Sequence, residues 1–183
     1  MRLIQPEARF RGERVLLRLA ALADCTPTYV GWLQDPEVSQ FLETRWSQQT
    51  LSSVRSFVDA MLSSTDSYLF AIEFENVHVG NLKIGPIHRH HHFADLSYFI
   101  GKRELWGRGI ATDAIRTATR VGFEVLKVHR MQAGLYASNV GSGRALEKVG
   151  YRLEGNFRAQ LSLRPGVWED HLWYGLLAED WKK

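Results

Sequence analysis

The sequence is poor in cysteine, in long apolar runs and in clustered charge. Its one cysteine, Cys25, excludes a disulfide within the chain and fits a reducing compartment; we expect it to be a small, half-buried residue rather than a nucleophile. No apolar run approaches the ~20 residues of a membrane span, and residues 1–7 lack the apolar core of a signal peptide. These absences predict a cytoplasmic protein that does not cross a membrane.

Charge of one sign is also scarce. The 23 basic and 20 acidic residues are mixed along the chain and give a net charge of +3, with no basic tail and no arginine-rich block. That distribution argues against a nucleic-acid partner but permits a local preference for an anionic ligand. The chain has 183 residues, 45% of them hydrophobic, and shows no linker, repeat or low-complexity segment. Residues 1–183 are therefore expected to form one domain with a sizeable core.

What the chain does contain is an alternation of strand-like and helix-like segments. Asp24 is expected to cap the first helix, Glu75-Asn76 is a hairpin signal, and Gly150 is a helix C-cap. The expected strands are 14–19, 68–74, 77–84, 94–100, 129–136, 151–163 and 167–177. The expected helices are 24–33, 36–42, a third from 47 or 50 to 62, 110–126 and 144–149. This order predicts a mixed α/β sheet with helices on its faces.

Residues 104–112 are the most informative stretch. A strand pattern leads into them, and a helical pattern with apolar residues at spacings of three and four leads out over 110–126. Gly107 and Gly109 let the backbone turn sharply and approach a ligand. The first N–H groups of the helix have no intrahelical partner, and Arg108 adds a positive charge. Together they predict a seat for a phosphate or pyrophosphate, although many strand-to-helix turns use glycine for the turn alone.

The common nucleotide-binding loops fit this stretch poorly. A P-loop ends in Gly-Lys-Ser/Thr, whereas this loop ends in Gly-Ile-Ala-Thr, and a Rossmann loop needs a third glycine where Thr112 stands. The predicted ligand is therefore anionic, but it is neither a nucleoside triphosphate nor NAD.

Three motifs follow one another at workable spacing: Trp106-Gly-Arg-Gly-Ile-Ala111, Asn139-x-x-Ser142 and Glu147-Lys-Val-Gly-Tyr151. With them the chain resembles the GNAT superfamily of acetyl-CoA-dependent N-acetyltransferases, and within it the branch of the ribosomal-protein N-terminal acetyltransferases RimJ and RimL. The resemblance covers most of the chain. It implies a single-domain α/β fold whose mixed, mostly antiparallel sheet is splayed at its centre and flanked by helices. It also implies acetyl-CoA as the donor, no metal, and direct attack by a primary amine in a ternary complex.

The resemblance further implies where the coenzyme lies. The loop from 107 to 112 holds the pyrophosphate, in agreement with the anion seat. The pantetheine arm lies between two splayed strands and pairs with their free backbone groups, and Asn139 binds the arm's amide or orients the thioester. The residues expected to contact the coenzyme are Phe99, Ile100, Trp106, Gly107, Arg108, Gly109, Ile110, Ala111, Thr112, Asn139 and Ser142.

Two residues are candidates for proton transfer. The amine must lose a proton to a carboxylate or an ordered water, and the departing thiolate needs one. Asp95 stands where some family members carry a catalytic glutamate, and being one methylene shorter it would act through water; alternatively it is an acidic residue on a strand's solvent face. Ser142 stands where the Rim-like branch suggests a proton donor to sulfur; alternatively it satisfies N–H groups in the first helical turn. Alternation along the strand places Asp95 and Ser97 toward the acceptor cleft.

Two departures from the family leave the general acid open. Trp106 replaces the Gln or Arg of many superfamily members, and Leu146 stands where many have a tyrosine acid on the last helix. Tyr136 and Tyr151 are nearby in sequence, and we expect both in the core. Positioning of the reactants can account for much of the catalysis in such an enzyme.

The acceptor site is expected between the first helices and the closing hairpin. It would comprise Glu43, Arg45 and Trp46 with residues around 158–168, where Arg45 suits a phosphate or carboxylate. The acceptor is then a protein N-terminus or a small-molecule amine. The alternatives are an amino-sugar nucleotide, an antibiotic, or a non-catalytic acyl-CoA-binding module used in regulation. No nucleic-acid or membrane partner is expected, and a homodimer is left open.

Four histidines crowd one loop: His88, His90, His91 and His92. Imidazoles can hold a metal, but neighbours on an extended loop point to opposite sides, and no cysteine or carboxylate cluster completes a site. We expect a solvated loop at the mouth of the acceptor site, without a metal.

Overall fold

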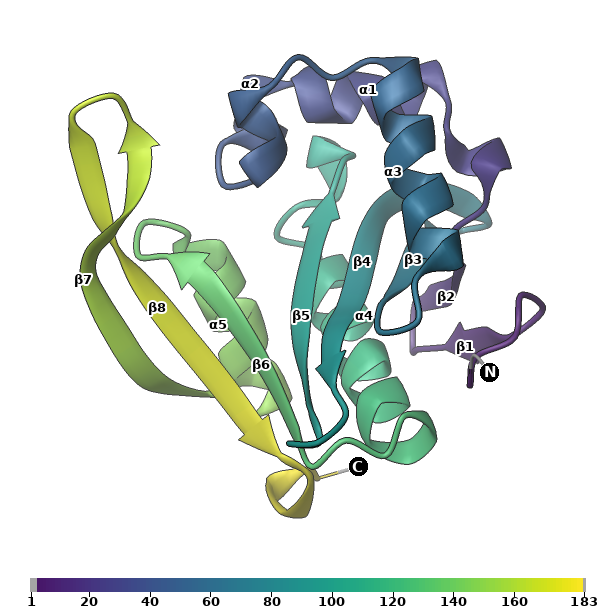
Figure 1. Ribbon diagram of the computed structural model, residues 1–183, viewed down its shortest axis with the longest axis vertical. Coiled ribbons are helices and arrows are strands. Elements are labelled where there is room, and N and C mark those ends of the chain that lie inside the picture. The colour runs from purple at the N-terminus through teal and green to yellow at the C-terminus, as the bar shows by residue number, and fades with distance from the viewer. Residues whose placement is uncertain (1–2, 183) are drawn as a thin grey trace.

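The computed structural model describes residues 3–182 as an α/β fold built on one eight-stranded sheet (Figure 1). The strand order is β1-β2-β3-β4-β5-β6-β8-β7, and the pairs are antiparallel except for β5 with β6. The strands are β1 (Arg9–Arg11), β2 (Val15–Leu19), β3 (Tyr68–Phe74), β4 (Val77–His88), β5 (Phe93–Ile100), β6 (Arg130–Tyr136), β7 (Arg152–Arg164) and β8 (Val167–Leu177). The α-helices are α1 (Pro27–Gln34), α2 (Pro36–Ser39), α3 (Leu51–Ser63), α4 (Ile110–Arg120) and α5 (Val140–Val149). Short turns are η1 (Leu22–Asp24), η2 (Glu43–Trp46), η3 (Arg103–Leu105), η4 (Val121–Val125, a π-turn) and η5 (Ala178–Asp180).

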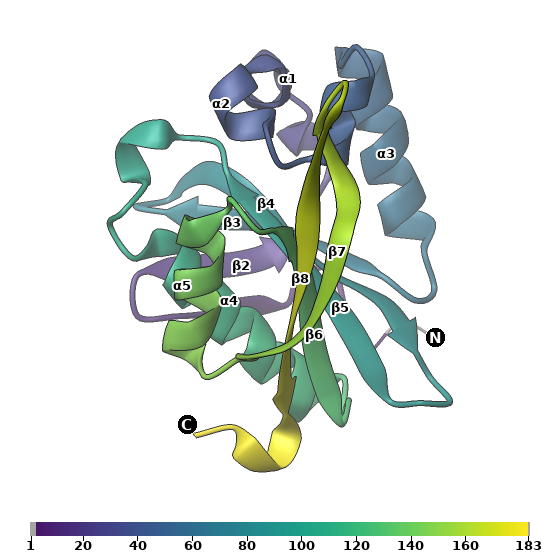
Figure 2. The ribbon, with the colours of Figure 1, turned by 90° about the vertical axis from the view of Figure 1, so that its left-hand side faces the viewer.

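Helices cover both faces of the sheet (Figures 1 and 2). Helices α4 and α5 close the larger core on one face, and α1 and α3 close a smaller core on the other. Successive residues of a strand point to opposite faces, so β3 sends Phe70 and Ile72 into the larger core and Leu69 into the smaller one. Cys25 is buried in the smaller core rather than half-buried as expected.

The sheet opens at its centre, as predicted. Strands β5 and β6 pair in parallel at only three positions, from Phe93 with Arg130 to Asp95 with Gln132. Beyond that point β5 stays paired with β4 up to Ile100, and β6 stays paired with β8 up to Tyr136, so the two strands diverge (Figure 1). The facing edges of their last residues are left without a neighbouring strand.

The histidine loop lies at the closed end of this opening, and its predicted place at the acceptor mouth stays a prediction. It connects β4 to the start of β5, and His129, just before β6, donates its N–H to the carbonyl of His92. The side chain of His88 stacks on Phe93 at 4.0 Å between ring centroids. No cluster of three or more metal-ligating side chains occurs among residues 3–182.

Several predicted boundaries at the N-terminal half are corrected by local hydrogen bonds. Asp24 does not cap α1, because Thr26 is the N-cap and its hydroxyl accepts the N–H of Tyr29. Helix α2 ends at Ser39 rather than at 42, and the expected loop after it contains the turn η2. Strand β1 was not predicted.

Two further boundaries lie beside the opening. Helix α5 begins at Val140 rather than at 144, since the side chain of Asn139 caps it. Strand β4 continues past Ile84 to His88, because pairing with β5 resumes after a register shift. The part of the chain in view, residues 3–182, contains no helix long and apolar enough to cross a membrane.

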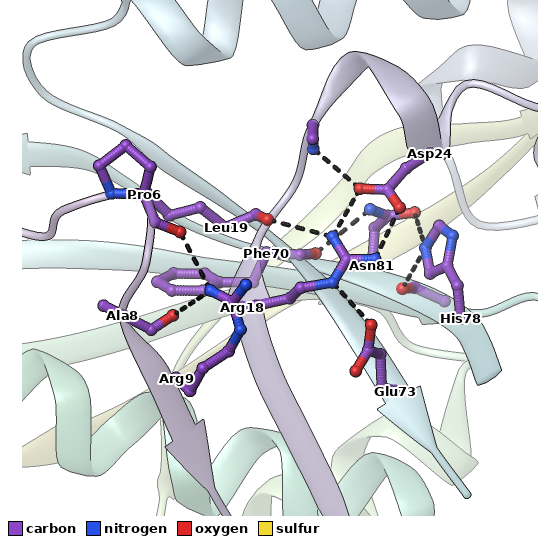
Figure 3. Close-up of polar contacts among 12 residues, drawn as sticks. Pro6, Ala8, Arg9, Arg18, Leu19, Asp24, Phe70, Glu73, His78 and Asn81 are labelled. Atoms are coloured by element: carbon purple, nitrogen blue, oxygen red, sulfur yellow. Dashed lines mark hydrogen bonds and ion pairs between the residues drawn. The ribbon is translucent and has the colours of Figure 1, made fainter. Parts of the chain in front are cut away.

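Asp24 instead belongs to an ion-pair cluster that joins β2, β3 and η1 (Figure 3). Arg18 donates two hydrogen bonds of 2.7 Å to the Asp24 carboxylate and one of 2.6 Å to Glu73. Asp24 also accepts the N–H of Ala21 at 2.8 Å. Burial is the largest single influence on the pKa of Asp24 and acts to raise it, but the hydrogen bonds from Arg18 and Ala21 and the charge of Arg18 together lower the pKa.

Candidate active site

The loop between β5 and α4 has the geometry of an anion seat. Gly107 and Gly109 have φ of +71° and +81°, a region in which a side chain is strained. Gly109 is the N-cap of α4, and no side chain caps the helix. Its first N–H groups are therefore available to a ligand at the positive end of the helix dipole. Strand β5 ends at the open end of the splay, and the loop with η3 leads from there to α4, so this helix start lies at that end.

Three anchors hold the loop and the helix start in place. The indole N–H of Trp106 donates to the carbonyl of Ile100 at 2.8 Å, which ties the loop to the end of β5. Arg14 donates to the carbonyl of Arg108. Asp113, in the first turn of α4, accepts three backbone N–H groups from residues 13–15 at 2.8–3.1 Å. The Asp113 carboxylate thus fixes the helix start against β2, while the outward N–H groups remain free.

On the face of the sheet that carries α4 and α5, two hydroxyls meet across the opening. Tyr98 of β5 and Ser142 of α5 form a hydrogen bond of 2.7 Å. Burial raises the pKa of Tyr98 to about 12, although the bond with Ser142 acts to lower it. The hydroxyl of Ser142 thus contacts Tyr98, and its backbone N–H donates to the side chain of Asn139.

Asn139 ends the other side of the opening. Its Oδ1 accepts the N–H of Ser142 at 3.3 Å and so caps α5 just past the end of β6. The cap engages the amide oxygen and leaves the amide nitrogen as a donor at the open end of the splay. Leu146, at the position of the family's tyrosine acid, is completely buried, and Tyr151 is a core residue bonded to Thr119, as expected.

On the opposite face, a polar row begins at the closed end of the opening. Asp95 accepts a hydrogen bond of 2.8 Å from Gln132, its partner on β6. Gln132 in turn accepts one from Arg130, which pairs with Glu154 of β7. A shallow pocket lies along this row, over Phe157 and Trp173. Asp95 therefore lies on the face of the sheet away from α4 and α5, the side on which strand alternation predicts it.

The first helices and the closing hairpin meet through Arg45. Its Nη2 donates to the Tyr136 hydroxyl and to the carbonyl of Ser162, both at 2.7 Å. Its guanidinium also stacks between Trp46 and Tyr136, at 4.5 and 4.8 Å from the ring centroids. Glu43 accepts the Tyr136 hydroxyl at 3.2 Å. Arg45 thus joins η2 to β6 and β7, and Tyr136 is buried in the core, as expected, with its hydroxyl in this cluster.

The tryptophans divide between core and surface. Trp32 is buried beside Phe99, with ring centroids 6.3 Å apart, so the Phe99 side chain packs under α1 while its backbone borders the opening. Trp46 and Trp168 are 52% and 61% exposed, which leaves both free to contact an acceptor.

Sequence reasoning missed His171 of β8 and its neighbour Gly134 of β6. A Cβ on Gly134 would lie 2.3 Å from His171 Nε2, so the imidazole lies directly against the backbone of β6. Gly134 is two residues beyond the last paired position, Gln132, where the opening has begun. A glycine inside a strand often marks such a close approach, and this was the signal available in the sequence.

The two faces of the opening therefore carry different chemistry. Hydroxyl donors and the uncapped helix start lie toward α4 and α5, whereas carboxylates and an imidazole lie on the other face. A molecule in the opening can be held by an anionic group at one end and attacked from the side that carries the bases.

Comparison with known proteins identifies the class of protein that uses this arrangement. The family model described as "Acetyltransferase (GNAT) domain" matches residues 14–152, more than half of the chain. The chain belongs to the GNAT family of acetyltransferases, a class of enzymes that use acetyl-CoA.

Two relatives and one solved structure show what the chain is similar to. It is 41% identical over 87 residues to "Probable N-acetyltransferase YjcK" of Bacillus subtilis, covering 48% of this chain and 47% of the relative. It is 33% identical over 91 residues to "[Ribosomal protein uS5]-alanine N-acetyltransferase" of Escherichia coli, covering 49% of this chain and 45% of the relative. Each match thus spans about half the length of the relative. In fold, the chain resembles Mycobacterium smegmatis RimJ in complex with CoA-disulfide, with a TM-score of 0.82 at 23% identity over 97% of this chain and 90% of that one.

Proposed function

We propose that the protein binds acetyl-CoA in the opening between β5 and β6 and transfers the acetyl group to a primary amine by direct attack in a ternary complex. One observation carries this proposal: an uncapped helix start with two positive-φ glycines lies at the open end of a strand pair with unpaired edges. The helix start suits the pyrophosphate, and the free strand edges suit the amide-bearing pantetheine arm.

The coenzyme seat comprises the residues that the sequence motif indicated. N–H groups at Ile110, Ala111 and Thr112 would bind the pyrophosphate, with Arg108 adding charge. The backbone of β5 near Phe99 and Ile100 would pair with the arm, and the amide of Asn139 would donate to it. This fit depends on backbone groups, so it tolerates Trp106 in place of Gln or Arg.

The two faces of the opening supply the groups that the reaction needs. The amine attacks the thioester carbon, a backbone N–H of the splayed β5 stabilises the oxyanion, and collapse breaks the C–S bond. Ser142, hydrogen-bonded to Tyr98, donates a proton to the departing thiolate. A base on the other face takes a proton from the amine, and Asp95, acting through water, is the candidate that the sequence supplied.

The acceptor would enter from the face that carries Asp95, beside Glu43, Arg45 and Trp46. A protein N-terminus is supported by the E. coli relative, whose name specifies an alanine of ribosomal protein uS5. A small-molecule amine fits the same opening, because attack requires only a free amine.

Release of free thiol from acetyl-CoA tests the proposal. The panel contains uS5-type peptides with an N-terminal alanine, polyamines, amino sugars, amino-sugar nucleotides and aminoglycosides, and each product is checked by mass for one added acetyl group. We expect amine-dependent release with at least one class. Binding of acetyl-CoA without release by any class would instead favour a regulatory binding module.

A further inference from the structure

We propose that His171, held by Gln160 and seated on Gly134, is the general base that takes the proton from the acceptor amine. This inference deepens the proposed function and rests on it. It assigns the base to β8 rather than to Asp95 of β5, and the argument rests on the tautomer of the ring, its place along the opening and its surroundings.

The tautomer of His171 is fixed by one hydrogen bond. Nδ1 lies 2.6 Å from Oε1 of Gln160. An amide oxygen can only accept, so Nδ1 carries the proton and donates it. In the neutral ring, Nε2 then holds a lone pair, and it makes no hydrogen bond with any residue in the range 3–182. A proton acceptor is therefore exposed on a half-buried side chain.

The position of Nε2 follows from Gly134. Nε2 lies 2.3 Å from the position that a Cβ of residue 134 would take, too close for a side chain to be present there. Residue 134 lies where β5 and β6 have already parted, whereas Asp95 lies at the last paired position and is bound to Gln132. A thioester lying in the opening is accordingly closer to His171 than to Asp95, and the ring reaches it only because residue 134 lacks a side chain.

The other candidate bases are already engaged. Glu154 pairs with Arg130, and Glu43 accepts the hydroxyl of Tyr136. These partners hold one oxygen of each carboxylate, whereas the other oxygen can still accept a proton. Nε2 of His171 has no hydrogen-bond donor among residues 3–182, so it can accept the proton of the amine without giving up another contact.

The surroundings of the ring keep it neutral. Burial lowers the pKa of His171, and the negative charge of Glu43 opposes this without cancelling it. Phe157 and Trp173 pack at the ring, with centroids 6.4 and 5.1 Å away. The titratable and charged groups of the described residues on this side of the sheet include Glu43 and Arg45 of η2, Tyr136 of β6 and Glu169 of β8, and the polar row adds Asp95, Arg130 and Glu154.

The proton balance closes with these groups and solvent water. The acceptor arrives as an ammonium ion and gives one proton to Nε2, which leaves the neutral amine to attack. As the C–S bond breaks, the nitrogen gives its second proton to water and the sulfur receives one from Ser142, which regains a proton from water through Tyr98. The products are the amide and free thiol. The imidazolium then returns its proton to water.

His171→Gln tests the assignment with the best acceptor from the thiol-release panel. We expect kcat to fall by about 10²- to 10⁴-fold under conditions where chemistry limits turnover, with the acetyl-CoA-induced rise in melting temperature unchanged. The wild-type kcat should fall on the acid side as Nε2 becomes protonated, and this acid limb should be absent in the variant. His90→Gln, on the exposed loop at the closed end, is the matched control and should leave kcat and the acid limb unchanged.

A second variant distinguishes a role of His171 in proton transfer from a purely structural role. Gln160→Glu places a carboxylate against Nδ1–H, which favours the imidazolium and should move the acid limb to higher pH. Asp95→Asn should keep the acid limb if His171 is the base. The assignment is overturned if His171→Gln retains the wild-type kcat, or if the limb survives in it and disappears in Asp95→Asn. Absence of transfer by the wild type would overturn the proposed function itself, which separates the two failures.

Discussion

At the scale of single residues, the hydroxyl pair formed by Tyr98 and Ser142 is a contact between residues 44 positions apart. Its bond length of 2.7 Å is typical of two hydroxyls, and burial keeps Tyr98 neutral with a pKa of about 12. A neutral phenol can resupply the proton that Ser142 gives to the thiolate. The pair is therefore expected to act together.

Substitutions in the pair should lower turnover more than coenzyme binding. We expect Ser142→Ala to lower kcat by about 10- to 100-fold and Tyr98→Phe by a smaller factor, since general acid catalysis is worth about 10²–10⁴ when it is complete. The double variant should be no slower than Ser142→Ala, because the two hydroxyls act in series. Single-turnover rates check this, and an unchanged rate for Ser142→Ala would leave that residue with a structural role only.

Asp24 provides a residue-scale test of stability. Its pKa is lowered in the folded protein, so its contribution to the free energy of unfolding is present above the unfolded pKa of about 3.9 and is lost as pH falls through the lower folded value. Asp24→Asn leaves Arg18 paired with Glu73 alone. We expect this substitution to lower the free energy of unfolding by about 3 kcal/mol at pH 6. Urea unfolding should show that the difference in free energy of unfolding between the wild type and the variant becomes smaller below about pH 4. Asp59→Asn, exposed on α3, should show no such difference.

At the scale of elements, the start of α4 depends on a glycine for its geometry. Gly109 caps the helix at a φ of +81°, where a branched residue is strained, and a Cβ would project near the seat of the pyrophosphate. We expect Gly109→Val to abolish the rise in melting temperature that acetyl-CoA gives the wild type.

A helical glycine elsewhere supplies the control for that substitution. Nothing lies within 4 Å of a Cβ on Gly31 in α1, so Gly31→Ala should stabilise the fold by roughly 0.5–1 kcal/mol and leave the acetyl-CoA effect intact. A Gly109→Val protein that is folded and binds acetyl-CoA normally would show that the pyrophosphate lies elsewhere.

At the scale of the whole molecule, two halves of one sheet meet at three residue pairs and part beyond them. A coenzyme arm in the opening gives backbone partners to both edges. We therefore expect acetyl-CoA to slow amide hydrogen exchange in residues 96–100 and 133–136. Exchange in β3, which is paired on both sides, should stay unchanged. Unchanged exchange at both edges with the coenzyme bound would place the arm outside the opening.

The sequence by itself determined the elements and the loop that begins α4. Periodicity and turn residues are local signals, so the strand 68–74, its Glu75-Asn76 turn and the glycines at 107 and 109 were predicted correctly. The family resemblance added the splay of the sheet. Some predicted boundaries were wrong where a capping side chain binds another group. Asp24, for example, does not cap a helix, because its carboxylate accepts hydrogen bonds from Arg18.

Only the tertiary structure decided which groups face one another across the opening. Tyr98 meets Ser142, and His171 meets Gly134, because strand register brings together residues that are far apart in the chain. No local pattern encodes such a contact, since it depends on how two halves of the sheet diverge. The elements that form the site can therefore be predicted from the sequence. Which acidic and basic groups face one another in the site is decided by the packing of β5, β6 and β8.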